Sequence, residues 1–490
     1  MVDERTLAER LPCRGNIRVL DLAVKGERTN TSAVGMMGRL HRVRLQLSFP
    51  RDIFSTGRKS SPKDISTAGR KMKIATFSEV ISPEVGILIA GYGRNDVSIG
   101  KHDDLRFTGI CIDDGERRAV LIAFDLIGLS RWLVVKIRKA VAEVIGCREV
   151  EVVLTCSHTH EGPHTRDSWA NPVNEPYCEF LVETVVASAK RMMEKNDFKE
   201  VIPYFYSARV PVNVNRRYCG PENVCRFLPC HRDLEPLGDG IVDSELGMVF
   251  FFAAQSQVDG GRPIAAIANF AAHPLLNHAP WVGGLSISAD YPGPFREHVT
   301  ADTGAFCIFT TGAAGNQFPK GSELGYTHLE EVARPLAAEF VRGMINARRN
   351  GKHFKLEPKV RCSSETFTVG LRKDRPAEHF NPNMQGKSEY ELELQFLAIG
   401  DICFVGVPGE LEVEPGLEIK WHSPFRRTWI LYNSTDYICY ICPVNDFVSG
   451  GYESSHGQQI EYRGALKIVN AAVEGLFKLH GEEIDVPAYP

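Results

Sequence analysis

The sequence lacks long hydrophobic runs, an excess of charge of one sign and internal repeats. Because no stretch of about 18 apolar residues occurs, no helix is expected to span a membrane. There are 57 Lys and Arg against 61 Asp and Glu, and a net charge of −4 gives no reason to expect affinity for nucleic acid or anionic membranes. With 43% hydrophobic and 24% charged residues, the chain is neither collagenous nor wholly disordered. These features indicate a globular protein of enzyme size.

The cysteines lack the regular spacing of a disulfide framework. There are 13, an odd number, and they are scattered along the chain. Near the N-terminus, the longest apolar patch, at residues 19–24, is interrupted by Asp21 and is too short for a signal-peptide core. We therefore expect reduced thiols and a cytoplasmic protein.

The first 72 residues differ in composition from the rest. Residues 1–72 hold 15 Lys and Arg against 7 Asp and Glu, a net charge of +8, so the remainder carries −12. They are rich in Ser, Thr, Gly and Arg and show no sustained period. We interpret them as a basic, disordered leader, with a natural translation start at Met72 or a basic docking arm as alternatives. A single large catalytic domain is expected over 73–480, with a tail at 481–490.

From Lys73 onward, short β-rich runs alternate with amphipathic stretches. Strands are predicted at 119–124, 150–155, 264–270, 305–309, 402–407 and 428–432, and helices at 176–194, 327–347 and 464–479. The second helix begins with a capping box, Thr327-x-x-Glu330, and contains Pro335, which predicts a kink or a late start. The alternation predicts an α/β fold with a mixed β-sheet core flanked by helices.

The strand at 150–155 leads into a cluster of histidines: His158, His160 and His164 lie within seven residues. This density favours a functional site over a polar loop whose imidazoles only bond to their neighbours. In an extended segment, His158 and His160 would point to opposite faces, so one metal ion would not normally take both unless a loop changes the spacing.

Three other predicted strands also lead into polar residues. The strand at 264–270 runs into His273, the strand at 402–407 into Glu410, and the strand at 428–432 into a segment with Tyr440. Open α/β sheets place their sites at the carboxyl ends of strands. Two imidazoles and a carboxylate form the donor set of a catalytic zinc ion, which keeps one position open for water. The alternative is that Glu410 and Tyr440 are ordinary surface and core residues.

Six short motifs occur in a specific order between Lys73 and Leu479. They are His-Thr-His-x-Gly-Pro at 158–163, Asn-Arg at 215–216, His-Pro at 273–274, Gly-Ala-Ala-Gly at 312–315, Pro-Gly-Glu at 408–410 and Tyr-x-x-Tyr at 437–440. In this order the sequence resembles the catalytic domain of the neutral and alkaline (non-lysosomal) ceramidases, and it is most similar to their uncharacterised bacterial relatives. The resemblance implies a zinc-dependent amidase of the neutral ceramidase fold.

The resemblance also implies a set of site residues. Zinc would be held by His158, His273, Glu410 and Tyr440, with His160 in the neighbourhood of the metal and Arg216 facing the substrate. We expect His160 to relay a proton to the leaving amine and Arg216 to bind a substrate oxygen. Asn316 and Gln317, on the Gly-rich turn, are candidate donors to an oxyanion or to the substrate.

The chain departs from the ceramidase pattern at one site position. Ceramidases follow the Gly-rich turn with Asp-x-Ser-Pro, whereas this chain has Phe318 at the serine position. A phenyl ring acts neither as a nucleophile nor as a hydrogen-bond donor to an oxyanion. We also expect neither the C-terminal immunoglobulin-like domain of the ceramidases nor a secretion signal in this protein.

These features predict a zinc-dependent hydrolase that cleaves an amide (N-acyl) bond with metal-activated water. It would be ceramidase-like without being a true ceramidase, would act on a small or lipid-like N-acyl substrate and would belong to lipid metabolism. The alternative is a catalytically silent, metal-stabilised binding protein of the same fold.

Cysteine patterns leave two further alternatives open. Cys219, Cys225, Cys230 and His231 form either a structural zinc site or an ordinary loop, and the looser spacing favours the loop. The Cys-x-x-Cys pattern at 439–442 is either a redox motif or a pair of small buried thiols.

Two aspartates also have two interpretations each. Asp125, which follows the strand at 119–124, either orients a ligating histidine or forms a structural salt bridge. Asp290 is either a turn cap or a residue near the site.

Overall fold

The computed structural model describes residues 71–91, 96–219, 225–227, 240–254, 261–276 and 285–482. The predicted leader, apart from its last two residues, and most of the predicted tail lie outside them. The first strand begins at Met72, whose side chain is buried, one residue before the predicted start of the domain.

The larger of two central β-sheets has eight strands in the order β13-β11-β10-β6-β1-β3-β4-β5. These strands are β1 (Met72–Val80), β3 (Arg106–Asp113), β4 (Arg118–Phe124), β5 (Val152–Cys156), β6 (Lys199–Arg209), β10 (Glu245–Ala253), β11 (Pro263–Phe270) and β13 (Phe306–Thr311). The sheet is mixed, because β4 pairs with β5 and β11 with β13 in parallel, while the other neighbours are antiparallel.

The smaller sheet has the order β15-β16-β17-β19, with β17 and β19 parallel. Its strands are β15 (Val360–Gly370), β16 (Glu389–Ile399), β17 (Ile402–Gly406) and β19 (Arg427–Leu431). Four short pairs join loops: β2 (Gly100–Lys101) with β12 (Ser286–Ile287), β7 (Asn213–Asn215) with β14 (Gln317–Pro319), β8 (Arg217–Cys219) with β9 (Cys225–Phe227), and β18 (Glu410–Leu411) with β20 (Tyr440–Ile441).

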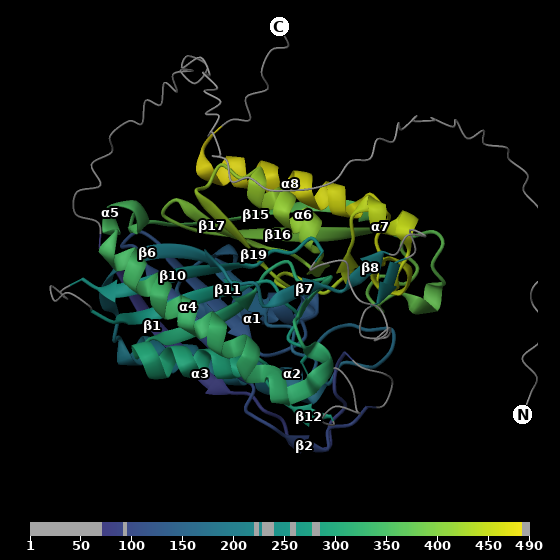
Figure 1. Cartoon of the computed structure of the whole chain (residues 1–490), viewed down its shortest axis with the longest axis horizontal. Coiled ribbons are helices and arrows are strands. Elements are labelled where there is room, and N and C mark those ends of the chain that lie inside the picture. Colours follow the sequence, from purple (N-terminus) through teal and green to yellow (C-terminus); the bar gives the residue numbers. More distant parts are fainter. Residues whose placement is uncertain are drawn as a thin grey trace, which may run out of the picture. The chain divides into compact units, whose positions relative to one another are not determined.

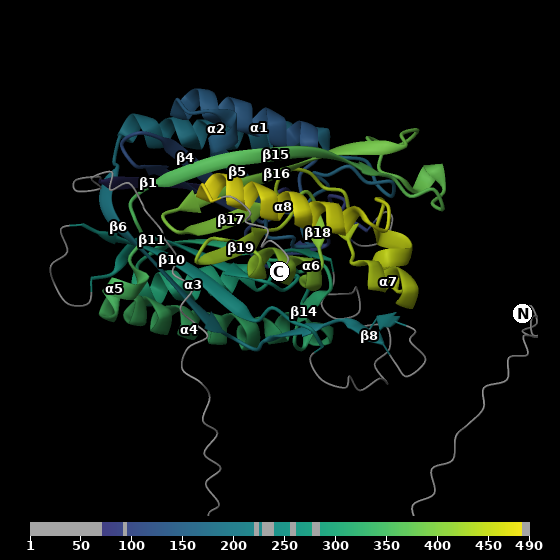
Figure 2. The same ribbon diagram turned by 90° about the horizontal axis from the view of Figure 1, so that it is seen from above.

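Helices cover the outer faces of both sheets. The α-helices are α1 (Arg131–Ile145), α2 (Glu175–Lys195), α3 (Pro292–Thr303), α4 (Leu329–Arg349), α5 (Gly351–Phe354), α6 (Val413–Trp421), α7 (Val444–Ser449) and α8 (Gly464–His480). Figure 1 shows α6 and α8 over the smaller sheet and α3 and α4 on the opposite side, against the larger one. Figure 2, turned by 90°, shows α1 and α2 side by side over the other half of the larger sheet.

The core lies between the two sheets, where both contribute inward-facing side chains. Phe251 from β10 and Phe404 and Trp429 from the smaller sheet belong to one buried apolar cluster. A fully buried aromatic side chain stabilises the fold by roughly 1.5–3 kcal/mol. This packing holds the ends of β5, β11, β17 and β19 in fixed relative positions, which is what a site assembled from their loops requires.

The predicted mixed α/β architecture is confirmed, and each predicted strand and helix lies within two residues of an observed one. The predicted capping box at the start of α4 is wrong. The helix begins at Leu329, after a 3-10 turn (Ser322–His328), and His328, not Thr327, is its N-cap. Pro335 lies well inside the helix, so it does not delay the helix start, and the alternative of a kink stays a prediction. None of the described helices is long and apolar enough to cross a membrane.

Candidate metal centre

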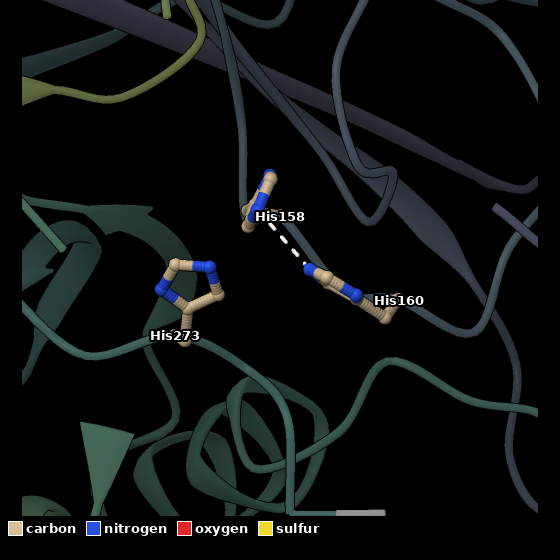
Figure 3. Close-up of side chains that lie close together, drawn as sticks. All are labelled: His158, His160 and His273. Carbon is tan, nitrogen blue, oxygen red and sulfur yellow. Dashed lines mark hydrogen bonds between the residues drawn. The ribbon is translucent and has the colours of Figure 1, made fainter. Parts of the chain in front are cut away.

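Three imidazoles from two loops converge in the interior. His158 and His160 follow β5, and His273 follows β11; Figure 3 shows the three rings pointing toward one another. Their ligand nitrogens all lie within 4.8 Å of one another, and all three side chains are buried. The loops after β5 and β11 therefore bring three histidines to one place.

Of the two alternatives for His158 and His160, the loop applies, because the backbone is not extended at this point. His158 has φ 74°, in the left-handed region that side chains other than glycine rarely adopt. This turn brings the Nε2 atoms of His158 and His160 to 3.2 Å from each other. Strain at a single buried polar residue is typical of functional sites.

Backbone carbonyls orient the rings. Nδ1 of His158 lies 2.6 Å from the carbonyl oxygen of Ile127, and Nδ1 of His273 lies 2.6 Å from that of Ala314. Since a carbonyl oxygen can only accept, each Nδ1 carries the hydrogen and each Nε2 presents a lone pair. Metal-binding histidines are commonly held in this way.

The carboxylate of Glu410 completes the cluster. Its Oε2 lies 3.2 Å from Nε2 of His158 and 3.4 Å from Nε2 of His273. Nε2 of His273 is buried and has no hydrogen bond among the described residues. Lone pairs of nitrogen and carboxylate oxygen thus face one another in a dry interior, an arrangement that a bound cation stabilises.

The protonation states also suit a cation. Burial lowers the pKa of His273 to about 4 and that of His160 well below its usual value, and repulsion among the imidazoles adds to both shifts. Burial alone would raise the pKa of Glu410, but His158 and His273, when they carry a proton, hold it well below its usual value. Neutral imidazole and ionised carboxylate are the forms that bind metal ions.

Two tyrosines donate to Glu410. The Tyr437 hydroxyl donates to Oε1, and the Tyr432 hydroxyl donates to Oε2 at 3.2 Å. Tyr440 is the register partner of Glu410 in the parallel pair of β18 and β20, so the two residues are direct neighbours. The hydroxyl of Tyr440, however, accepts a hydrogen bond from Arg216 at 2.9 Å.

Arg216 is buried and already paired. Its Nε donates to Glu453 at 2.6 Å, and its guanidinium carbon lies 4.6 Å from the centre of the Phe318 ring. The Phe318 ring in turn lies edge-on to His273, with 5.4 Å between ring centres. The position that the motif resemblance matches to a serine therefore lies beside the cluster, and in this chain it carries an apolar ring.

Asn316 and Gln317 hold loops together. Nδ2 of Asn316 donates to Glu414 at 3.1 Å, and Nε2 of Gln317 donates to the carbonyl of Ala313 at 2.6 Å. Both side chains are fully buried. The Gln317 backbone carbonyl also accepts from the His273 backbone NH, which ties the Gly-rich turn to the metal centre. Their predicted role as substrate donors stays a prediction, since these amides donate within the scaffold.

Asp125 and Asp290 have structural partners. Asp125 forms a bidentate ion pair with Arg296, at 2.8 and 2.6 Å, and His158 is oriented by a carbonyl instead. This geometry supports the salt-bridge interpretation. Asp290 accepts from the backbone NH of Leu276 at 2.7 Å and so anchors the loop after β11.

Nine cysteines are free thiols: Cys111, Cys147, Cys156, Cys178, Cys307, Cys362, Cys403, Cys439 and Cys442. Cys439 and Cys442 are buried, and burial raises the pKa of both. This environment favours inert packing over redox chemistry. Of the other cysteine cluster, Cys230 and His231 lie outside the described residues.

A cavity of about 1010 Å³ lies elsewhere, beside β3 and α3. Arg296 and Tyr326 are among the residues that line it, and the three clustered histidines are not. The Tyr326 hydroxyl donates to Glu161 at 2.7 Å, one residue after His160. The cavity therefore lies next to the cluster of His158, His160 and His273, and these three residues do not line it.

Several residues around the centre escaped sequence reasoning: Arg166, Tyr432, Asn433 and Glu453. Asn433 lies 2.7 Å from Nδ1 of His158 and donates to the same Ile127 carbonyl. A signal existed for two of them, because Arg166 lies two residues after His164 and Tyr432 ends a predicted strand. Nothing in the sequence near Glu453 indicates a partner for Arg216.

Two solved structures share this architecture. A crystal structure of neutral ceramidase from Pseudomonas aeruginosa aligns with a TM-score of 0.66 and 16% identity, covering 86% of this chain and 76% of that one. A ceramidase complexed with C2 aligns with a TM-score of 0.66 and 15% identity, covering 86% and 77%. Neither a protein-family model nor a curated protein sequence matches the chain. The chain thus has the fold of the neutral ceramidases, as the order of its motifs predicted.

Proposed function

We propose that this protein is a zinc-dependent hydrolase that cleaves the C–N bond of an N-acyl amide, with ceramidase-like chemistry but a substrate other than ceramide. The convergence of His158 and His273 on the buried Glu410 carboxylate carries the proposal. The fold shared with neutral ceramidases supports it. Nitrogen and oxygen donors of this kind suit zinc, whose catalytic sites use three protein ligands or more and keep an open position.

The proposed zinc ligands are His158, His273, Glu410 and Tyr440. The first two have their Nδ1 atoms tied to carbonyls at 2.6 Å, which directs Nε2 into the centre. Tyr440 lies next to Glu410 in the β18–β20 pair, and its bond from Arg216 would stabilise a phenolate. Arg216 is therefore proposed to have two roles: it stabilises the Tyr440 oxygen and it binds an oxygen of the substrate.

His160 is proposed as the proton carrier. A bound zinc ion supplies Lewis acidity and lowers the pKa of a water molecule toward about 7. In the hydrolysis, water adds its oxygen to the carbonyl carbon, the C–N bond breaks, and the amine nitrogen must receive a proton. The Nδ1 atom of His160 is 3.2 Å from the Gly91 carbonyl, and its Nε2 lies 3.2 Å from Nε2 of His158, so the ring lies at the edge of the proposed ligand set.

Hydrolysis of a panel of N-acyl amides tests the proposal. The full chain should cleave at least one short- or long-chain N-acyl amide, lose that activity with a chelator and regain it with zinc. Zinc-loaded protein that cleaves no member of the panel would contradict the proposal.

Phe318 favours a second candidate, a metal-stabilised binding protein without turnover. Its ring is buried between His273 and Arg216, in the place where ceramidases have a serine. The same panel separates the two candidates, because a binding protein would retain an N-acyl amide intact, whereas the hydrolase would release an amine.

A further inference from the structure

Arg166 is a buried cation that has no carboxylate partner among the described residues. Its residue is 8% exposed, and no described residue accepts a hydrogen bond from its buried Nε. Across the described residues, its side chain forms no ion pair or hydrogen bond, and its guanidinium carbon lies 4.2 Å from the centre of the Tyr437 ring. By contrast, the equally buried Arg138 pairs with Glu393 and Arg216 pairs with Glu453.

The loop that carries Arg166 is fixed on both sides. The Thr165 hydroxyl donates to the Gly128 carbonyl at 2.7 Å, and the Asp167 backbone NH donates to the Ser130 hydroxyl at 2.6 Å. The Tyr437 ring beneath the guanidinium donates its hydroxyl to Glu410. The guanidinium of Arg166 is therefore held in a fixed position. The ring of Tyr437 lies between it and Glu410, a proposed zinc ligand.

Stacking alone does not account for a buried charge. A cation–π contact stabilises by about 0.5–2 kcal/mol, whereas removing an ion from water costs several kcal/mol. Asp167 and Glu410 lie within electrostatic range of Arg166, but neither pairs with it. The fold thus maintains an uncompensated positive charge beside the centre, as expected where a ligand supplies the negative charge.

A second arginine lies near some of the residues that surround Arg166. Arg375 donates to the main-chain carbonyls of His379, His456 and Gln458 and has no carboxylate partner among the described residues. Arg166 and Arg375 both lie within electrostatic range of Cys439 and Tyr452, which places them around the same group of residues.

We propose that Arg166 binds a carboxylate of the substrate, so that the substrate class is an N-acyl amide with a carboxylate close to the scissile bond. An N-acyl amino acid carries it on the amine side, and a dicarboxylic acid monoamide carries it on the acyl side. One guanidinium matches one charge, which favours a carboxylate over a dianionic phosphate. The cleavage step rests on the proposed function, but recognition of the carboxylate does not.

Three amides of matched size test the proposal on the full chain as purified with zinc. N-dodecanoylglycine has the carboxylate on the amine side, N-dodecanoylglycinamide replaces it with a neutral amide, and the dodecylamine monoamide of succinic acid has it on the acyl side. Hydrolysis is measured as kcat/KM and binding as Kd by calorimetry. The variants are Arg166→Gln, Arg166→Lys, and Arg138→Gln as the control for loss of a buried arginine.

The wild type should prefer one carboxylate amide over the neutral amide by about 10- to 100-fold, and Arg166→Gln should abolish this preference without weakening the neutral amide. Arg166→Lys should retain part of it, and Arg138→Gln should retain all of it. Equal use of charged and neutral amides, or equal loss of both in Arg166→Gln, would overturn the inference. If no amide is cleaved but the Kd values show the preference, the inference holds and the proposed hydrolase function fails.

Discussion

Nε2 of His158 lies 3.2 Å from Oε2 of Glu410, and neither side chain is more than 2% exposed. Two polar groups are buried together at such a distance only when hydrogen bonds or a cation compensate for the lost hydration. Each has such support, His158 from the Ile127 carbonyl and Glu410 from two tyrosine hydroxyls. His158 and Glu410 are therefore held rigidly as a pair of possible metal ligands, and substitutions at the two positions test this role.

Substitution of either His158 or Glu410 should abolish zinc binding. We expect His158→Ala and Glu410→Ala each to lose bound zinc, measured by elemental analysis of the purified protein, because losing a ligand weakens a tetrahedral site. His164→Gln is the matched control: His164 is also buried in this motif, but its Nε2 faces the Ile89 carbonyl, outside the cluster. Full zinc occupancy in both alanine variants would refute the proposed ligands.

Acid should destabilise the metal-free protein. Burial lowers the pKa of His164 and of His273 to about 4, so below pH 6.5 the unfolded chain takes up protons that the folded chain does not. The contribution of these two histidines to the free energy of unfolding is therefore fully present above about pH 6.5 and is lost as the pH falls toward 4. We expect the free energy of unfolding to fall by about 2 kcal/mol per histidine between pH 7 and 5.

Urea denaturation at the two pH values measures this loss. In His164→Gln, the contribution of one histidine is absent, so the acid-induced loss should be smaller by about 2 kcal/mol. An unchanged loss in this variant would show that His164 takes up its proton equally in both states.

Glu453 should be essential for stability. We expect Glu453→Gln to lower the free energy of unfolding by about 3–5 kcal/mol, because it leaves the charge of Arg216 buried without its carboxylate. Glu79→Gln is the control, since Glu79 pairs with Arg191 at an exposed site, where an ion pair contributes about 1 kcal/mol or less. Similar small losses in both variants, measured by chemical denaturation, would contradict the expectation.

A side chain at Gly91 should lower activity, because it would displace the ring of His160. A Cβ at Gly91 would lie 2.3 Å from Nδ1 of His160, so we expect Gly91→Ala to displace the ring and lower kcat by about tenfold or more. Gly86→Ala is a matched control, because Gly86 has a similar φ, 102° against 97°, but a Cβ there meets no atom within 4 Å. The control should lose about 1 kcal/mol of stability and retain kcat. Equal kcat in the two variants would exclude the role proposed for His160.

The sequence alone predicted the strands and helices because their signals are local. β-branched runs such as 402–407 and the amphipathic pattern of 464–479 carry their periodicity within a few residues. The order of the motifs likewise predicted the neutral ceramidase fold. The capping box at Thr327 failed because a 3-10 turn precedes α4 and makes His328 the N-cap, which side-chain types alone do not reveal.

The geometry of the candidate metal centre depends on distances between residues far apart in the sequence, which no local sequence pattern contains. The sequence by itself determined that histidines, a glutamate and tyrosines follow particular strands. Only the tertiary structure decided that His158 adopts a positive φ and so faces His160, that Glu453 neutralises Arg216, and that Arg166 has no such partner in the part of the chain that the structure describes. The physical reason is that charge compensation and ring orientation are set by neighbours far apart in the chain, which come together only when the two sheets pack.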